Sequence, residues 1–235
     1  MTTAIVTGAS SGLGACIANR LRAVDITVHN WSLETFVDVS NEWVVQKLAN
    51  DFKEEVNSPV NAVVDILVNC AGYNHMDYIT DFPTTEWDKV MEANAKSIFL
   101  CTKYLAPLMV NGTICNIISS ASEVPMTHSI AYNASKAAAA MMTRQMAKEL
   151  YQTHGITVFG VSPAKMKNTG MSRKIDKRAA DLRGITEEQA HEYQISKLLT
   201  GEEIDPDVCA EFIAWLLEKD HRHMYLAGCI LEYGA

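Results

Sequence analysis

Short apolar runs alternate along the chain with longer stretches in which apolar residues recur every three or four positions. The short runs predict strands, and the nearly continuous apolar run at 63–69 predicts a strand buried on both faces. The longer stretches predict amphipathic helices. We expect strands at 3–7, 26–31, 35–39, 63–69, 113–119, 156–161 and 228–232. We expect helices at 13–23, 40–56, 85–109, 131–151 and 206–218, with Ser40 and Thr85 as caps and with Asn57, Ser58 and Pro59 ending the second helix.

This alternation of about seven strands with helices predicts an α/β fold: a doubly wound parallel sheet, Rossmann-like, with helices on both faces and right-handed crossovers. The length of 235 residues fits one domain, 1–235. The segment 169–205 is polar, charged and weakly periodic. We expect it to be an insertion over the sheet within that domain.

Composition excludes several classes of protein. The net charge of −8 disfavours nucleic acid or an anionic membrane as a partner. The six cysteines are scattered, with no Cys-x-x-Cys pair, and predict reduced residues of a cytoplasmic protein. We find no signal peptide and no apolar run long enough to span a bilayer. No cluster of metal-ligating residues is apparent, so we expect no metal.

Three glycines, Gly8, Gly12 and Gly14, stand between the first predicted strand and the first predicted helix. Unpaired N–H groups and the positive end of the dipole at a helix N-terminus suit a pyrophosphate. Gly8 permits the tight turn, Gly12 lets the backbone approach the phosphates, and Gly14 lets helix and strand pack closely. The hydroxyls of Thr7, Ser10 and Ser11 add possible donors. The alternative is a glycine-rich turn that binds nothing.

Further motifs follow in a fixed order along nearly the whole chain. They are Thr7-Gly8-(x)3-Gly12-x-Gly14, the turn Asn69-Cys70-Ala71-Gly72, Asn94, Ser119, Tyr132 and Lys136. On these residues the chain resembles the short-chain dehydrogenase/reductase family. The resemblance implies an NAD(P)-dependent oxidoreductase that moves a hydride between nicotinamide and a ketone or secondary alcohol.

The resemblance also assigns catalytic roles. Tyr132 is the expected general acid or base, and Lys136, four residues on, lies on the same helix face. We expect its ammonium to lower the phenol pKa from about 10 and to hold the nicotinamide ribose. Ser119, thirteen residues before Tyr132, is preferred to Ser120 as the residue that hydrogen-bonds the substrate oxygen. Asn94 is expected to support a chain of waters that returns protons.

The cofactor, NAD or NADP, is expected to lie against residues that match the family's motifs. These cofactor-binding residues are Gly8, Ser10, Ser11, Gly12, Leu13, Gly14, Ser32, Asp38, Val39, Asn69, Ala71, Gly72, Tyr132, Lys136, Pro163 and Thr169.

The sequence departs from the family pattern near the adenosine end. Only residues 32–34 separate the second and third predicted strands, where the family usually has a helix. The position that selects NAD or NADP is Ser32, which is neither acidic nor basic. Glu34 is a candidate for binding the ribose diol of NAD, and Ser32, Asn30 or His29 for donating to the phosphate of NADP. The choice between NAD and NADP stays open. Asp38 matches the aspartate that contacts adenine in the family.

A further departure follows the sixth predicted strand. The usual Pro-Gly turn is Pro163-Ala164, where positive φ is less accessible. The usual threonine five residues past the proline is displaced, with Asn168 in its place and Thr169 after it. We favour Thr169 as the residue that holds the nicotinamide amide.

The residues expected to face the substrate do not identify the substrate. The family's mobile lid corresponds to 171–184, where five basic residues outnumber two acidic ones. This charge suits an anionic substrate, or it is only a solvated helix face. His75, Met126 and His128 fall in loops at the substrate mouth. The helices at 85–109 and 131–151 are expected to form a homodimer or homotetramer interface.

Two other functions fit part of the pattern. A dinucleotide-binding regulator or scaffold without turnover fits the shortened adenosine region, but has no need of Tyr132 and Lys136 together. An epimerase or dehydratase of the longer sugar-nucleotide branch needs a larger C-terminal substrate region than this sequence has.

Overall fold

A parallel sheet forms the centre of the molecule. The computed structural model describes residues 2–55, 64–218 and 223–234, and within these ranges it contains six strands in the order β2-β1-β3-β4-β5-β6. The strands are β1 (Thr3–Thr7), β2 (Thr27–Trp31), β3 (Ile66–Asn69), β4 (Thr113–Ile117), β5 (Thr157–Pro163) and β6 (Ile230–Tyr233). All of their pairings are parallel.

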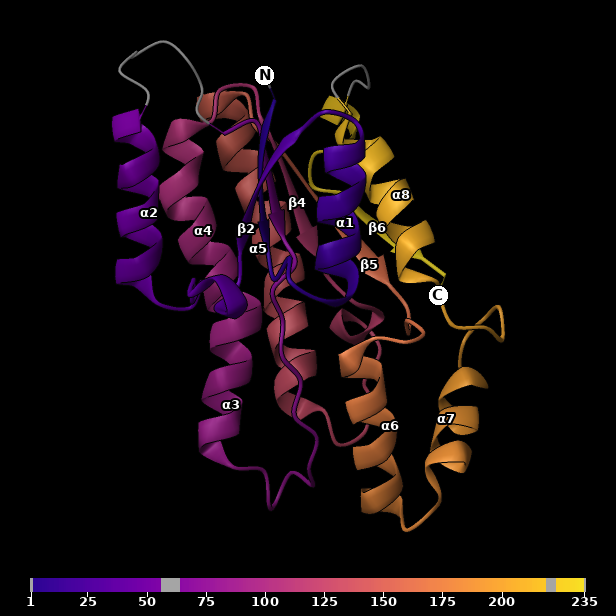
Figure 1. Cartoon of the computed structure of the whole chain (residues 1–235). Coiled ribbons are helices and arrows are strands. Elements are labelled where there is room, and N and C mark those ends of the chain that lie inside the picture. Colours follow the sequence, from indigo (N-terminus) through magenta and orange to yellow (C-terminus); the bar gives the residue numbers. More distant parts are fainter. Residues whose placement is uncertain (1, 56–63, 219–222, 235) are drawn as a thin grey trace.

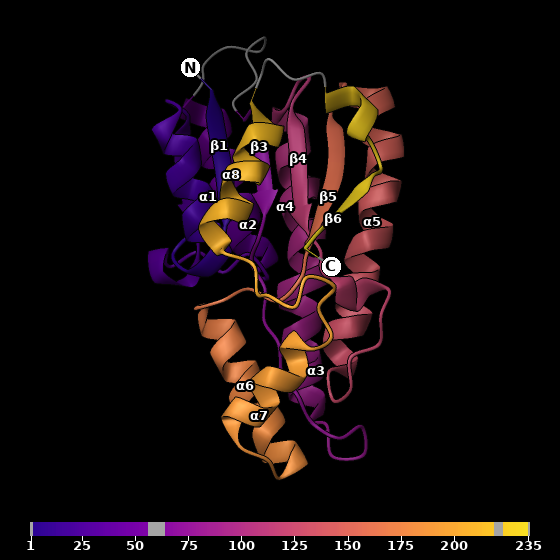
Figure 2. The ribbon, with the colours of Figure 1, turned by 90° about the vertical axis from the view of Figure 1, so that its right-hand side faces the viewer.

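Helices cover both faces of the sheet (Figures 1 and 2). On one face lie α1 (Gly12–Ala23) and α8 (Pro206–Leu217), and on the other α2 (Glu42–Glu55), α4 (Ser97–Leu105) and α5 (Ile130–His154). Successive residues of β1 serve opposite cores, because strand side chains alternate. Val6 packs in the core under α1 and α8, and Ile5 in the core under α2 and α4. Both faces are therefore apolar, as the uninterrupted apolar runs predicted.

The winding of the sheet reverses next to β1. The strands β1 and β3 are neighbours, and β2 lies on the other side of β1. In doubly wound sheets ligands bind at such a reversal, outside the carboxyl ends of the strands. The glycine turn after β1 and the turn after β3 meet at this point.

One predicted strand is wrong, so the sheet has six described strands rather than seven. Residues 35–39 do not pair with β2; a short 3-10 helix, η1 (Leu33–Thr35), follows instead. Ser32 and Thr35 form a reciprocal capping box, and Phe36 takes a left-handed conformation with φ 61°. This turn cannot continue as an extended strand. Consequently α2 lies between β2 and β3, and the expectation of two strands joined without a helix is also wrong.

The caps of two helices differ from prediction. Asn41 caps α2, since its Oδ1 accepts the Val44 N–H at 3.3 Å, whereas Ser40 donates to the Asp38 carboxylate. The expected end of that helix at 56–59 lies outside the described residues. Pro83, not Thr85, is the N-cap of α3 (Thr84–Met91).

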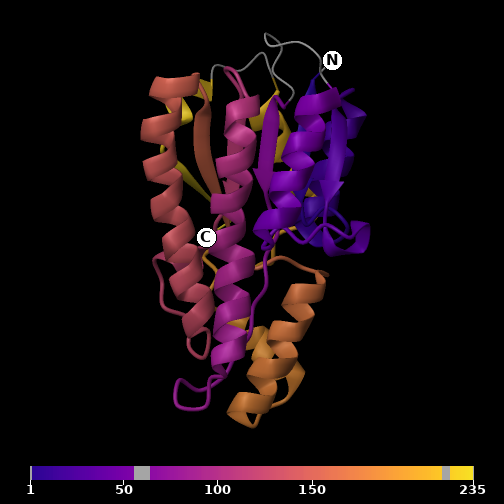
Figure 3. The same cartoon turned by 90° about the vertical axis from the view of Figure 1, so that its left-hand side faces the viewer.

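The long helix predicted at 85–109 forms, but in four segments. A π-helical turn, η2 (Glu92–Lys96), joins α3 to α4, and a 3-10 turn, η3 (Ala106–Leu108), ends the run. Figure 3 shows α3 and α4 in line. An extra residue in a helical turn is often associated with function, and Asn94 lies in this one.

The polar segment 169–205 folds into α6 (Gly170–Arg183) and α7 (Glu187–Ile195). These helices extend beyond the carboxyl ends of the strands and do not lie over a face of the sheet (Figures 1 and 2). Met76, Ala179, Ala180 and Ala190 form a small apolar core of their own there. In the described ranges, no helix has both the length and the apolar composition that crossing a membrane requires.

Candidate active site

The glycine turn after β1 is built for close approach. A Cβ on Gly14 would lie 2.4 Å from the Gly8 carbonyl oxygen, and one on Gly8 would lie 2.9 Å from Ala71 Cα. Gly8 and Gly12 also have φ of +64° and +52°. Above Gly12 there is open space, since the nearest atom to a Cβ there is Thr169 Cγ2 at 4.0 Å. The turn thus exposes backbone at the start of α1.

Thr7 couples this turn to the one after β3. Its Oγ1 accepts hydrogen bonds from the backbone N–H groups of Cys70 and Ala71, both at 2.9 Å. The Asn69 side chain points into the fold, where its Nδ2 donates to Asn116 Oδ1 at 2.8 Å. A Cβ on Gly72 would lie 3.3 Å from Asn94 Oδ1. The segment 69–72 therefore has its backbone, rather than the Asn69 side chain, at the candidate cofactor site.

Asn94 is fully buried in the π-helical turn, and its side chain is saturated with partners. Its Nδ2 donates to the Tyr73 carbonyl and to Ser135 Oγ, each at 2.9 Å. Its Oδ1 accepts the Tyr73 N–H at 2.7 Å. Asn94 thus ties the loop after β3 to α5, one residue before Lys136.

Ser119, Tyr132 and Lys136 come together between β4 and α5. The Ser119 hydroxyl lies beside the Tyr132 hydroxyl, close enough to lower its pKa. The Lys136 Nζ lies 5.8 Å from the centre of the Tyr132 ring and donates to the Ile117 carbonyl at 2.7 Å. Ser120 begins the 3-10 turn η4 (Ser120–Ser122) and lines a pocket that neither Ser119 nor Tyr132 lines.

The pKa shifts in this group follow burial. Burial raises the pKa of the Tyr132 phenol, and the neighbouring Ser119 hydroxyl opposes the rise. This direction is opposite to the one expected from a neighbouring ammonium. Burial also lowers the pKa of Lys136 to about 8 and raises that of Cys70, which is near Lys136, to about 12. At neutral pH the tyrosine is a protonated acid.

Around Ser32, the chain forms a compact polar network with the glycine turn. Ser32 Oγ and Ser10 Oγ are hydrogen-bonded, and Asn30 Nδ2 donates to Ser10 Oγ at 3.0 Å. Ser32 is only 5% exposed. His29 packs edge-on against Phe52, with ring centres 4.7 Å apart, whereas Glu34 is exposed. The segment after β2 thus bends back towards the glycine turn.

Asp38 and Val39 follow in the same loop. Asp38 Oδ1 accepts from the Ser40 N–H at 2.9 Å and from the Ser40 hydroxyl at 2.7 Å, while Val39 is buried. The Asp38 carboxylate therefore shapes this loop and keeps its second oxygen available.

At the other end of the candidate site, β5 ends with Pro163. Ala164 has no positive φ and donates its N–H to the Tyr233 carbonyl at 3.0 Å; Asn168 is the residue with positive φ, 60°. Thr169 caps α6, since its Oγ1 accepts the Ser172 N–H at 3.1 Å. Of the two residues considered for the amide contact, Thr169 is the one beside Gly12.

Polar contacts hold α6 against the loops at 76–77 and 127, which were expected to form the substrate mouth. Arg178 donates to the Asp77 carboxylate at 2.8 Å and to the Met76 carbonyl at 3.0 Å. Arg183 donates to Thr127 Oγ1 at 2.9 Å. Two of the basic residues expected to attract an anionic substrate thus bind protein groups.

The two histidines expected at the substrate mouth have protein neighbours. His75 lies between Asp77 and Glu86, with ring nitrogens 3.9 and 3.6 Å from their carboxylates. His128 has φ 66° and packs edge-on against Tyr78, with ring centres 4.9 Å apart. Met126 is exposed in the same loop as His128.

Sequence reasoning missed a polar cluster around Lys165. Its Nζ lies 2.7 Å from Asp176 Oδ1 and 3.4 Å from Glu203 Oε1, and His191 Nδ1 lies 2.9 Å from Asp176 Oδ2. Asp176, His191 and Glu203 bring three potential metal ligands together, although the sequence showed no such cluster. Lys165 already neutralises part of their charge. In the sequence, the only feature that pointed to this cluster was the position of Lys165, two residues past Pro163.

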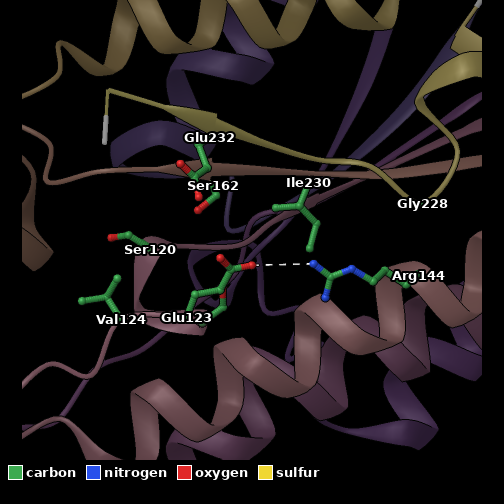
Figure 4. A pocket seen from close by; sticks show the side chains of 9 residues that line it. Ser120, Glu123, Val124, Arg144, Ser162, Gly228, Ile230 and Glu232 are labelled. Carbon is green, nitrogen blue, oxygen red and sulfur yellow. Dashed lines mark ion pairs between the residues drawn. The ribbon is translucent and has the colours of Figure 1, made fainter. Parts of the chain in front are cut away.

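A pocket of about 200 Å³ lies between η4, α5 and the edge strand β6. Figure 4 shows Glu123 and Arg144 facing each other across it, 3.6 Å apart. The pocket extends from Arg144, twelve residues past Tyr132 on α5, to Ser120, the residue next to Ser119. Neither Ser119 nor Tyr132 lines it.

Comparisons with known proteins match most or all of the chain. A family model described as short chain dehydrogenase matches residues 2–180. The chain is 31% identical to the 5-keto-D-gluconate 5-reductase of Escherichia coli strain K12, over 69% of this chain and 71% of that protein. It superposes on NAD+-bound xylitol dehydrogenase with a TM-score of 0.88 at 22% identity, covering 100% and 98% of the two chains. With a variant of actinorhodin polyketide ketoreductase with NADPH, the TM-score is 0.84 at 25% identity, covering 98% and 95%.

Proposed function

Because the chain belongs to the short chain dehydrogenase family and is an NAD(P)-dependent oxidoreductase, we propose that Tyr132, Ser119 and Lys136 carry its chemistry. The reaction interconverts a small-molecule ketone and a secondary alcohol. The observation that carries the assignment is the position of buried Lys136, whose Nζ lies 5.8 Å from the centre of the Tyr132 ring, with Ser119 beside the Tyr132 hydroxyl.

The residues present fit a dinucleotide. The glycine turn leaves backbone N–H groups exposed at the start of α1, and the Gly8 and Gly14 positions have no room for a side chain. When bound, the nicotinamide supplies or accepts the hydride. We propose that the segments around Ser10–Leu13, Ser32, Asp38–Val39, Ala71–Gly72 and Pro163–Thr169 hold the rest of the dinucleotide, since all border the same edge of the sheet.

Tyr132 acts as the proton donor in ketone reduction. Burial raises the pKa of its phenol, so the side chain carries the proton at neutral pH. Ser119 lies beside the same hydroxyl and is placed to hydrogen-bond the substrate oxygen as negative charge develops there. In the reverse direction, Tyr132 accepts the proton of the alcohol.

Lys136 fixes the geometry behind Tyr132. One N–H of its Nζ is bound by the Ile117 carbonyl, which leaves two for ribose hydroxyls. With a pKa of about 8, the group is largely an ammonium at neutral pH. Its positive charge favours negative charge on Tyr132 when the proton leaves.

Asn94 positions these groups. All of its side-chain hydrogen bonds go to Tyr73 and Ser135. In this proposal it acts by fixing α5 against the turn after β3, and any support of a water chain comes from the backbone of the π-helical turn.

The segment 169–205 is a lid within a single domain that comprises residues 1–235. Its contacts Arg178–Asp77 and Arg183–Thr127 fasten it over the substrate mouth. We assign these two cations to lid closure; the exposed Lys174 and Lys177 remain as the groups that would favour an anionic substrate.

The outer faces of α4 and α5 support a homodimer or homotetramer. Phe99, Met141 and Tyr151 expose much of their apolar surface there. The cytoplasmic location stays part of the proposal, because all six cysteines are free thiols, as expected in a reducing compartment.

The test is a panel of small ketones, with NADH and NADPH each offered, followed by nicotinamide absorbance. Tyr132→Phe keeps the ring and removes the proton donor, so we expect a loss of at least about 100-fold in kcat for any ketone that the wild type reduces. The control is retained NADH or NADPH binding by Tyr132→Phe. Unchanged turnover in this variant would refute the assignment, and binding without turnover on the whole panel would favour the regulator.

A further inference from the structure

We propose that the chain uses NAD(H) in preference to NADP(H), and that Glu34 is the residue that sets this preference. The inference rests on the proposed cofactor site and decides a point that Ser32 alone leaves open. It depends on three observations: a closed neutral network at the end of β2, the absence of nearby cations, and an unengaged carboxylate.

The first observation is the network around Ser32. Its hydroxyl is shared with Ser10 and Thr35, and its N–H donates to Thr35 Oγ1 at 3.1 Å. Asn30 Nδ2 is occupied by Ser10 Oγ. The neutral donors that were candidates for holding a phosphate therefore already have partners within the protein.

The second observation is the local charge. Neither the glycine turn and first half of α1, residues 7–19, nor the segment 23–46 contains a lysine or arginine. The segment 23–46 instead carries four carboxylates, Asp25, Glu34, Asp38 and Glu42. The flanking cations are engaged: Arg20 with Glu211 at 3.7 Å, and Arg22 with Asn19 at 3.3 Å. Lys103 of α4 is held by Glu42 at 2.7 Å.

The third observation concerns the carboxylates themselves. Asp38 is held by Ser40 through Oδ1, which leaves one oxygen free, and Glu42 is held by Lys103 and Tyr104. Glu34 is exposed in η1 and makes no hydrogen bond or ion pair with any other described residue. Since η1 bends back towards the glycine turn, Glu34 is the carboxylate with both oxygens free at the end of β2, where the cofactor's adenosine ribose lies in this fold. Figure 1 shows this segment at the carboxyl end of β2, the end at which α1 begins.

These observations discriminate between the two cofactors. A 2′-phosphate adds between one and two negative charges and requires Arg or Lys. Here it would meet carboxylates, and neutral donors that are largely engaged within the protein. The ribose diol of NAD instead offers two hydroxyl donors, which a carboxylate accepts.

The experiment is a titration of the full-length chain with NADH and, separately, with NADPH. The signal is energy transfer from the four tryptophans to the bound nicotinamide, and the shift in thermal midpoint is a second readout. We expect NADH to bind at least about tenfold more tightly, a difference of about 1.4 kcal/mol.

Two variants and a matched control locate the cause. Glu34→Gln removes the charge at constant size, and we expect about fivefold weaker NADH binding with tighter NADPH binding. Leu33→Arg places a cation at a position that is 71% exposed, so it disturbs no packing, and should tighten NADPH about fivefold. Leu33→Gln, the control, should leave the ratio unchanged.

The outcomes separate this inference from the proposed function. Tighter or equal binding of NADPH by the wild type would overturn the preference and leave the oxidoreductase assignment intact. A wild-type preference for NADH that Glu34→Gln leaves unchanged would overturn the role of Glu34. Binding of neither cofactor would overturn the cofactor site and both proposals together.

Discussion

The two ends of the candidate cofactor site are built in different ways. At the catalytic end, Asn94, Ser119 and Lys136 are buried and held by the sheet and two long helices. At the adenosine end, the segment from Ser32 to Ser40 lies beside the edge strand β2, with Leu33 and Phe36 71% and 95% exposed. The proposed catalytic groups are thus fixed by the core of the fold, whereas Glu34, the group proposed to discriminate between cofactors, lies on a largely exposed turn.

The largest effect is expected where the two ends meet, at Gly14. Gly14→Ala would place a Cβ 2.4 Å from the Gly8 carbonyl oxygen, with backbone rather than a flexible side chain in the way. We expect a loss of at least about 2 kcal/mol in the free energy of unfolding and loss of cofactor binding. Denaturant unfolding and NADH titration measure both. Gly170→Ala is the control, because no atom lies within 4 Å of a Cβ there.

At the catalytic end, we expect Lys136 to be required for activity although it lowers the stability of the fold. Lys136→Met removes a buried ammonium, so we expect turnover to fall by about 100-fold or more while the thermal midpoint at pH 7 stays level or rises. Steady-state kinetics and thermal unfolding of the cofactor-free protein check this. A clear loss of stability at pH 7 would contradict it.

The same lysine predicts a pH dependence of stability. Its pKa is about 8 in the folded protein and 10.5 in the unfolded chain. Between these values the unfolded state binds more protons, so the contribution of Lys136 to the stability of the cofactor-free protein should rise with pH from about 8. Buried thiols act in the opposite direction, because the pKa values of Cys70, Cys101 and Cys209 are raised from 9.0 to about 12, and Tyr132, whose pKa is raised from 10.0, adds to this at higher pH. Between pH 8 and pH 9.5, denaturant unfolding should therefore show a larger loss of stability for Lys136→Met than for the wild type, and equal losses would contradict the role of the lysine.

A smaller effect is expected at the lid. Arg178→Ala removes the hydrogen bonds to Asp77 and the Met76 carbonyl, which close α6 over the substrate mouth. We expect KM for the ketone to rise about fivefold with NADH binding unchanged. Lys177→Ala, one residue earlier and exposed, is the matched control. If both variants raise KM equally, the lid's charge matters rather than its closure.

The smallest effect, and one of opposite sign, is expected in the adenosine loop. Phe36 has φ 61° and is 95% exposed, so its side chain stabilises little while its backbone is strained. Phe36→Gly should change the free energy of unfolding by less than about 1 kcal/mol, towards greater stability. Chemical denaturation measures it. A loss above that amount would show that the aromatic ring has a structural role.

Sequence reasoning succeeded where the residues that form a contact are also close together in the sequence. Tyr132 and Lys136 are four residues apart in a helix, so their proximity follows from helical geometry. The tight turn at Gly8 and the close approach at Gly14 were predictable for the same reason, because both depend on the local backbone. The buried strands followed from unbroken apolar runs.

Sequence reasoning failed where a competing local interaction, or a partner far away in the sequence, determines the structure. Val37 and Val39 alternate like a strand, but the Ser32–Thr35 capping box and the Asp38–Ser40 turn prevent extension. Arg178 looked like a solvated or anion-binding residue because its partner, Asp77, is 101 residues away. The pKa of Tyr132 was predicted in the wrong direction because burial, which periodicity does not measure, is its largest influence.

The pair α6 and α7 has its own small core and is attached to the strands through polar groups such as Lys165. Evolution can therefore alter this pair in shape and charge without repacking the sheet. A lineage could acquire new substrates through changes between residues 169 and 205 while Tyr132 and its neighbours stay the same. Directed evolution or exchange of this module between relatives has the same freedom.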